Sequence, residues 1–241
     1  QLQNRQQQGR DGVWLDLPTT TEQVQASLRQ IGISSDNPQA LFISGYFAEE
    51  EKLFAIPYNM VLASSVDELN FLAARLETLS AGERAELNAA LQAPQSDLSS
   101  IGKITDFPEN VEYYVHLPDV HGPAQLGDYY LNRSGMVDMP EEWKGGIDTA
   151  QFGRYVAHQE QGVFTQYGYL VKSGDEWQKV HEGQPVPEEY RVLSFPAPEI
   201  LRDAANIPPP VQPEMEPQKV IPIMQKRSTV YGSSGSAFTT T

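Results

Sequence analysis

The sequence has no cysteine among its 241 residues. Disulfide bonds, thiolate nucleophiles and cysteine-rich zinc sites are therefore excluded, and packing and hydrogen bonds must stabilise the fold. No stretch approaches the roughly 20 consecutive apolar residues of a membrane-spanning helix, and no signal-like segment opens the chain. These absences predict a soluble, cytoplasmic protein without a membrane partner. The start at Gln1, in a Gln-rich stretch, indicates a fragment or a processed start.

Motifs that carry enzyme chemistry are also missing. The sequence has no phosphate-binding loop, no dinucleotide fingerprint and no HExxH zinc motif. His116, Asp119 and His121 lie close together around a proline and could ligate a metal ion, but histidines in such a turn are more often polar loop residues. We therefore expect no metal, no cofactor and no enzymatic activity, and keep an enzyme built on His116 and His121 as a distant alternative.

Basic residues are scarce in the middle of the chain. Between Asp11 and Arg191 there are 28 Asp and Glu against 11 Lys and Arg, and the whole chain has a formal net charge of −15. The field of such a chain favours basic grooves and repels nucleic acids and anionic membranes. Solubility alone is the competing explanation for this composition.

The first predicted unit is a small α+β unit over residues 11–60. Residues 13–17 alternate like a strand, and residues 40–47 form a second predicted strand. Between them, Thr19 and Glu22 have the spacing of a capping box. The helix that follows has apolar residues on one face, namely Val24, Leu28 and Ile31.

A helical unit is predicted over residues 61–104. Two capping boxes, Ser65 with Glu68 and Ser80 with Glu83, each precede leucines at helical spacing. A unit of this size cannot bury a large core by itself, so we expect it to pack on its neighbours.

The third unit, residues 105–195, holds most of the aromatic residues. Its pattern predicts, in order, a strand over 111–117, a helix over 123–132, a helix capped by Asp148, and a β-hairpin of residues 163–171 and 176–180. Residues 196–241 are rich in Pro, Ser, Thr and Gly and are predicted to be a disordered tail. A polyproline ligand pattern at residues 210–213 competes there with a simple spacer. The predicted fold is thus an α+β, elongated chain of three small units with a disordered tail.

Five segments of this chain resemble, in order and spacing, segments of ArdA-type antirestriction proteins. They are GVWLDLP at residues 12–18, DELNFLA at 67–73, LGDYY at 126–130, FGRYVA at 152–157 and GVFTQYGY at 162–169. The resemblance covers about residues 11–171.

The resemblance implies a curved homodimer, carried by conjugative plasmids and transposons, whose acidic surface imitates the phosphates of duplex DNA. Such a protein occupies the DNA-binding groove of type I restriction-modification enzymes and binds no nucleic acid itself. The chain differs from the family pattern in three places: its Gln-rich opening replaces a strand, its helical unit is less acidic, and residues 177–241 extend beyond the similar region.

The candidate phosphate-mimicking residues are the acids expected to face outward from the second and third units. They are Asp67, Glu68, Glu77, Glu83, Glu86, Asp97, Asp106, Glu109, Glu112, Asp119, Asp128, Asp138, Glu141, Glu142 and Asp148. The candidate dimer contacts are Phe164, Tyr167 and Tyr169, for which burial in the core of one subunit is the alternative. The rival function is an acidic interaction module of a mobile element that docks on another basic partner.

Overall fold

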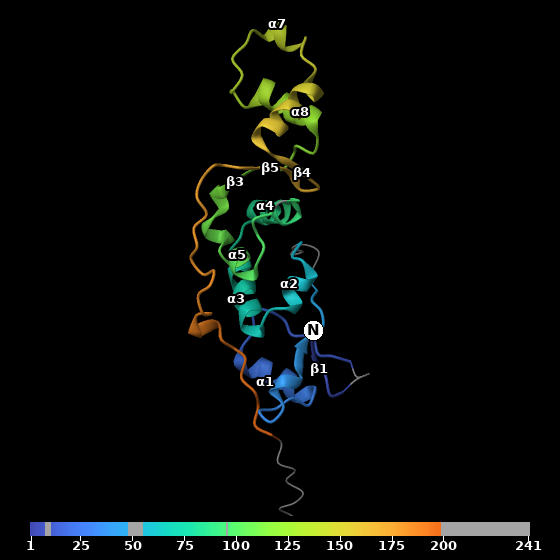
Figure 1. Cartoon of the computed structure of the whole chain (residues 1–241), viewed down its shortest axis with the longest axis vertical. Helices are drawn as coiled ribbons and strands as arrows, with labels where there is room; N and C mark the ends of the chain where they lie inside the picture. The colour runs from blue at the N-terminus through green and yellow to red at the C-terminus, as the bar shows by residue number, and fades with distance from the viewer. Residues whose placement is uncertain (8–10, 48–54, 95, 199–241) are drawn as a thin grey trace, which may run out of the picture. The chain divides into compact units, whose positions relative to one another are not determined.

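The computed structural model of the protein describes residues 1–7, 11–47, 55–94 and 96–198 (Figure 1). These residues form helices and two small antiparallel sheets, so the predicted α+β class is confirmed. The division into three units stays a prediction, and most of the predicted tail, with its polyproline pattern, lies outside the described residues. Within the described ranges, no helix is both long and apolar enough to cross a membrane.

The first sheet pairs two short antiparallel strands, β1 (Leu2–Asn4) and β2 (Leu41–Ile43). The prediction that the opening strand is missing is therefore wrong, because the Gln-rich start supplies β1. The predicted strand over residues 13–17 is also wrong, since only Val13 pairs, in an isolated bridge to Leu2. The predicted second strand is shorter than expected because β1 offers it only three partners.

Helix α1 (Thr21–Gln30) covers this sheet and leads, through the short helix η1 (Pro38–Ala40), into β2. Its capping box begins one residue later than predicted, with Thr20 as N-cap and Gln23 as the reciprocal partner. Glutamine serves this role as well as glutamate does, because both side chains can accept from the N-cap backbone N–H. The predicted apolar face is confirmed, since Val24 and Leu28 are fully buried.

Four helices follow: α2 (Tyr58–Leu62), α3 (Val66–Glu77), α4 (Ala81–Gln92) and α5 (Ile101–Thr105). Both predicted capping boxes are present, at the starts of α3 and α4. The leucines of these helices share one core with residues of the following segment, as expected for a helical unit that needs its neighbours. Members of this core include Leu69, Leu72, Leu76, Leu87, Ile104, Phe107, Tyr114 and Leu170.

Two short helices, η3 (Phe107–Glu109) and η4 (Val111–Tyr113), lead into the second sheet. That sheet has the order β3-β5-β4, formed by β3 (Tyr114–Leu117), β4 (Val163–Thr165) and β5 (Gly168–Lys172).

The predicted hairpin between residues 163–171 and 176–180 is wrong. Gly168, at φ +120°, divides the first segment, so β4 and β5 form the hairpin themselves. The other edge of β5 pairs with β3, and residues 176–180 form no strand. Since both edges of β5 are taken, no place in this sheet beside β5 is left for residues 176–180.

Helix α6 (Pro123–Asp128) continues into a π-helical turn, η5 (Tyr129–Arg133), and α7 (Glu141–Lys144) precedes α8 (Thr149–Glu160). Helices α6 and α8 approach closely through two glycines. A Cβ atom added to Gly127 or Gly153 would lie under 3.0 Å from backbone atoms of the opposite helix. Only glycine permits this approach, which explains the presence of a glycine in each of two segments that resemble the family.

Residues 177–196, which we call the strap, contain one short helix, η6 (Glu188–Tyr190), and return to the start of the chain. Val192 is 5% exposed and belongs to the same core cluster as Leu2, Val24 and Leu28. The strap appears in Figure 1 as the orange segment that passes α3 and α1. The C-terminal part of the described chain therefore completes the core around α1.

The substitution Gly153→Ala is expected to lower the free energy of unfolding by about 1–3 kcal/mol, because its methyl group overlaps the backbone of α6. Chemical denaturation followed by circular dichroism measures the change. Gly146→Ala is the control, since its Cβ would lie 3.5 Å from the Trp143 carbonyl oxygen, an ordinary contact. Equal stability of the two variants would contradict the role of Gly153.

Candidate functional site

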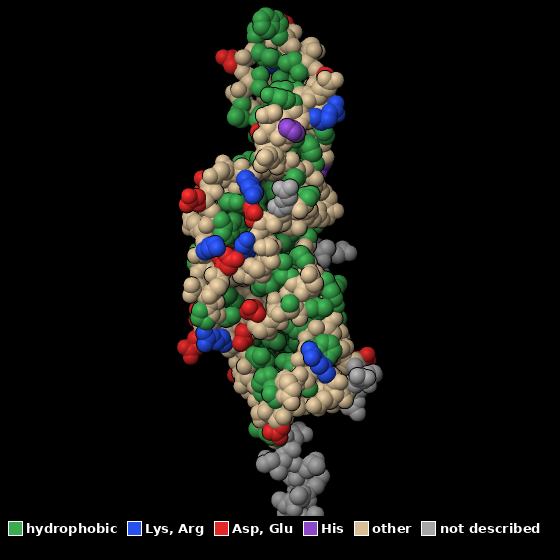
Figure 2. All heavy atoms as spheres, in the orientation of Figure 1, with side chains coloured by type: hydrophobic (Ala, Val, Ile, Leu, Met, Phe, Trp, Pro, Cys, Tyr) green, Lys and Arg blue, Asp and Glu red, His purple; other side chains and the backbone are tan. Residues whose placement is uncertain are grey.

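Five of the fifteen candidate acids are exposed, and their side chains form no hydrogen bond or ion pair with another described residue. They are Glu77, Glu112, Asp119, Asp138 and Glu142. Their charge is fully available to a partner. Figure 2 shows one face of the molecule, on which acidic side chains are scattered among basic and uncharged ones rather than gathered in one continuous patch.

Three candidate acids cap helices. Glu68 and Glu83 accept hydrogen bonds from the backbone N–H of Ser65 and Ser80, at 2.7 and 2.6 Å, and Asp148 accepts from the first turn of α8. The bonds from Ser80 hold the pKa of Glu83 below its ordinary value. Each of these carboxylates also meets the positive end of a helix dipole, so part of its charge is compensated within the protein.

Four candidate acids form ion pairs. Asp97 lies 2.6 Å from Lys172, Asp128 lies 2.9 Å from Arg133, and Glu141 lies 2.6 Å from Lys144, while Glu109 pairs with Arg75. Partial burial acts to raise the pKa of Asp97, but hydrogen bonds from Lys172 and Tyr113 outweigh it and leave this pKa lowered. Exposed ion pairs contribute at most about 1 kcal/mol to stability. Lys or Arg side chains of a basic partner can therefore replace the internal cation of such a pair.

Glu86 differs from the other candidates because its side chain is largely buried. Its Oε1 atom is buried and has no hydrogen-bond partner in the described part of the chain. Burial, together with the neighbouring charge of Glu83, raises the pKa of Glu86 to about 8. Glu86 is therefore mostly protonated at neutral pH and is poorly suited to imitate a phosphate.

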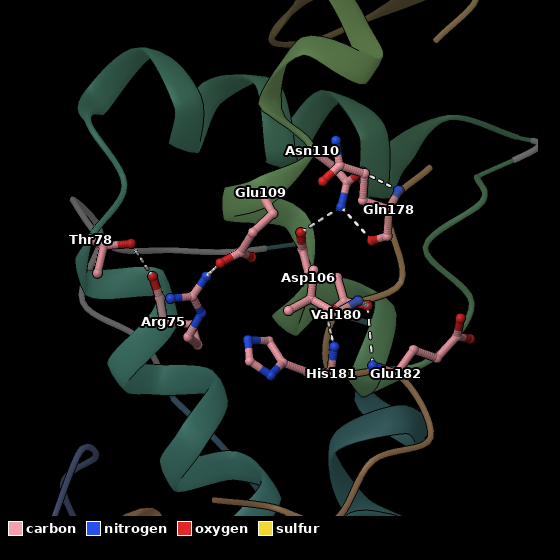
Figure 3. Close-up of polar contacts among 9 residues, drawn as sticks. All are labelled: Arg75, Thr78, Asp106, Glu109, Asn110, Gln178, Val180, His181 and Glu182. Atoms are coloured by element: carbon pink, nitrogen blue, oxygen red, sulfur yellow. Dashed lines mark hydrogen bonds and ion pairs between the residues drawn. The ribbon is translucent and has the colours of Figure 1, made fainter. Parts of the chain in front are cut away.

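Asp106 is fully buried, contrary to the prediction that it faces outward. Its carboxylate accepts the backbone N–H groups of Val180, His181 and Glu182 at 3.3, 2.6 and 3.1 Å (Figure 3). Three consecutive N–H groups aimed at one anion compensate its charge without a cation. Asp106 therefore holds the strap and presents no charge at the surface.

Asn110 and Asp67 hold the strap in similar ways. Asn110 donates to the Gln178 carbonyl oxygen at 2.9 Å and accepts the Gln178 N–H at 2.7 Å (Figure 3). One oxygen of Asp67 accepts the N–H groups of Val192 and Leu193 at 2.8 and 2.7 Å. Asp67, another candidate for partner binding, thus bonds a distant backbone segment that no local spacing in the sequence reveals.

The candidate dimer contacts differ in exposure. Tyr169 is fully buried and its hydroxyl donates to Glu160, so it fills the core of its own chain. Phe164, half-buried, packs on Tyr169 with ring centroids 4.9 Å apart, and Tyr167 is also half-buried. Sequence reasoning missed Glu160, which also accepts from Tyr130, because only the fold brings these tyrosines together.

The histidine cluster does not assemble a metal site. His116 Nε2 lies 2.7 Å from the Tyr167 carbonyl oxygen, to which it donates. Within the described ranges, no three His, Asp or Glu side chains lie in an arrangement that could hold a metal ion. These residues therefore give the enzyme alternative no geometric support.

Comparison with known families identifies the chain. The model of the antirestriction protein (ArdA) family matches residues 8–171, well over half of the chain. No curated protein matches it. The matched region contains all fifteen candidate acids and ends before the strap begins. The chain therefore belongs to the ArdA family of antirestriction proteins.

Proposed function

We propose that this protein imitates duplex DNA and blocks the DNA-binding groove of a type I restriction-modification enzyme. Membership of an antirestriction family, in a chain with a formal net charge of −15, is the observation that carries this proposal. An antirestriction protein must act on the restriction machinery, and a DNA-binding groove is the part of that machinery with an excess of positive charge.

Carboxylates can replace phosphates because both are anions that accept hydrogen bonds from Lys and Arg. When such a protein enters a DNA groove, ions that screened both surfaces are released, as they are when DNA binds. The Debye length is roughly 8 Å at physiological ionic strength, so each carboxylate must lie close to its basic partner. Local matching, more than net charge, then decides the affinity.

We assign the imitation of phosphates to fewer acids than the fifteen candidates, on the basis of their exposure and their bonds within the protein. Asp106 and Asp67 hold the strap, and Glu86 is mostly neutral. The exposed acids without partners contribute most, and the ion-paired and helix-capping acids contribute less. The principal set is Glu77, Glu112, Asp119, Asp138 and Glu142.

We also propose the setting in which the protein acts. It is a cytoplasmic, non-enzymatic homodimer from a conjugative element and requires no cofactor. Half-buried Phe164 and Tyr167 are the proposed dimer contacts, and sedimentation would contradict the dimer if only one 26.8 kDa species were found. The rival function is docking on a basic surface outside the DNA groove.

A titration of the protein into a type I methyltransferase that holds labelled duplex DNA tests the proposed function. We expect stoichiometric release of the DNA at low salt and weaker release at physiological salt, because the contacts are ionic. Fluorescence anisotropy of the DNA measures the release. Binding of the protein without release of DNA would favour the rival function, docking outside the groove.

Neutralising four exposed acids together is expected to weaken binding by between about fourfold and several-hundredfold, since each exposed ionic contact contributes about 0.2–1 kcal/mol. The variant carries Glu112→Gln, Asp119→Asn, Asp138→Asn and Glu142→Gln. Each single change should cost little. The same DNA-release assay measures all of these variants.

The control for this experiment removes four exposed acids from the N-terminal part of the chain, and therefore the same charge. It carries Asp11→Asn, Asp16→Asn, Glu22→Gln and Asp36→Asn. Equal loss of affinity in both variants would show that net charge alone governs binding and would contradict the assigned set.

Glu86→Gln is expected to stabilise the protein at pH 8 and to change its stability little near pH 4. The pKa of Glu86 is about 8 in the folded protein and lies near the ordinary 4.5 in the unfolded chain. As pH rises between these values, the unfolded state loses its proton first, so this carboxyl progressively destabilises the fold. Glutamine removes the cost.

Denaturation at pH 4 and pH 8 measures this effect, which should be on the order of 1 kcal/mol once partial exposure is considered. Glu77→Gln, at an exposed position of α3, is the control and should show no such dependence. A stability difference that does not grow with pH would mean that Glu86 ionises normally.

A further inference from the structure

The strap is fastened at two separate places, and polar side chains contribute to both attachments. At its first end, Asp106 and Asn110 bind the backbone of residues 178–182 through five hydrogen bonds (Figure 3). Trp177 packs on Tyr113 there, with ring centroids 5.1 Å apart. This attachment joins the strap to the segment between α5 and β3.

At its second end the strap is attached to α3 and to the region around α1. Asp67 accepts the N–H groups of Val192 and Leu193, and Asn70 donates to the Tyr190 carbonyl oxygen at 3.1 Å. Asn70 also accepts the N–H of Thr19 at 2.7 Å, so one side chain joins the strap to the segment before α1.

The middle of the strap is packed less closely. Residues 183–186 form one wall of a cavity of about 770 Å³, whose other walls come from α2, α3 and α5 and include Met60, Phe71 and Ile101. Tight apolar packing therefore does not hold this part in place. The strap is therefore held mainly at its two attachments.

We propose that the strap is a positioning element for the DNA-mimicking surface, with Asp106, Asn110, Asp67 and Asn70 as its positioning residues. It connects the core around α1, helix α3 that carries Glu77, and the segment that carries Glu112. This inference rests on the proposed function. Because many weak ionic contacts must form at once, a surface with fixed spacing binds more tightly than a flexible one.

The absence of cysteine makes the spacing measurable in the full chain. Spin labels on cysteines introduced at the exposed residues Gln30 of α1 and Gln92 of α4 report the distance between these helices. Asp106→Asn is expected to broaden that distance distribution and to raise hydrogen exchange at residues 180–182. It should also weaken DNA release from the methyltransferase about tenfold.

Asp16→Asn is the matched control, because it removes the same charge from an exposed position outside the assigned set of acids and away from the strap attachments. It should leave both the distances and the DNA release unchanged. A second variant inserts Gly-Ser-Gly-Ser after the exposed Gly183 and keeps every fastening side chain. This insertion should also broaden the distance distribution. It therefore tests the positioning role even if Asp106→Asn fails to fold.

Unchanged distances in both strap variants would overturn the positioning role. So would broadened distances accompanied by undiminished DNA release. If the unmodified protein released no DNA, the proposed function would fail. Broadened distances in the strap variants would still show that the strap fixes the spacing between α1 and the following helices.

Discussion

The C-terminal part of this structure depends on the hydrogen bonds that the buried carboxylate of Asp106 accepts. A carboxylate removed from water is costly unless hydrogen bonds compensate it, and three consecutive backbone N–H groups of the strap do so here. The compensation is mutual, because the same bonds satisfy N–H groups in a segment with little secondary structure. Through them the strap stays beside α5 and continues to the core around α1, where Val192 is buried.

This arrangement divides the acidic residues into two kinds. Asp106 and Asp67 bind backbone N–H groups, and Glu68, Glu83 and Asp148 cap helices, so these acids help to build the fold. The side chains of exposed acids such as Glu112 and Asp138 bond to no other described residue, so their charge is not compensated within the described part of the chain. The acidic composition thus overstates the charge that the protein surface offers, because part of that charge is compensated within the protein.

Local signals predicted local structure well. The boxes at Ser65 and Ser80 and the cap at Asp148 were predictable because the bonded groups lie within three residues of each other. The hairpin prediction failed because Gly168 divides one apparent strand, and the pairing of β5 with β3 joins residues about 55 positions apart. Strand β1 was missed because its apolar content is a single leucine within a polar segment.

The sequence by itself determined the α+β class, the net charge, the helix starts and the membership of the ArdA family, since composition, short spacings and ordered motifs carry that information. Only the tertiary structure decided which acids are available. The exposure of a carboxylate depends on segments that fold back from far along the chain, as residues 180–182 do on Asp106 and residues 192–193 do on Asp67. The raised pKa of Glu86 also depends on the tertiary structure, because burial by the surrounding core raises it.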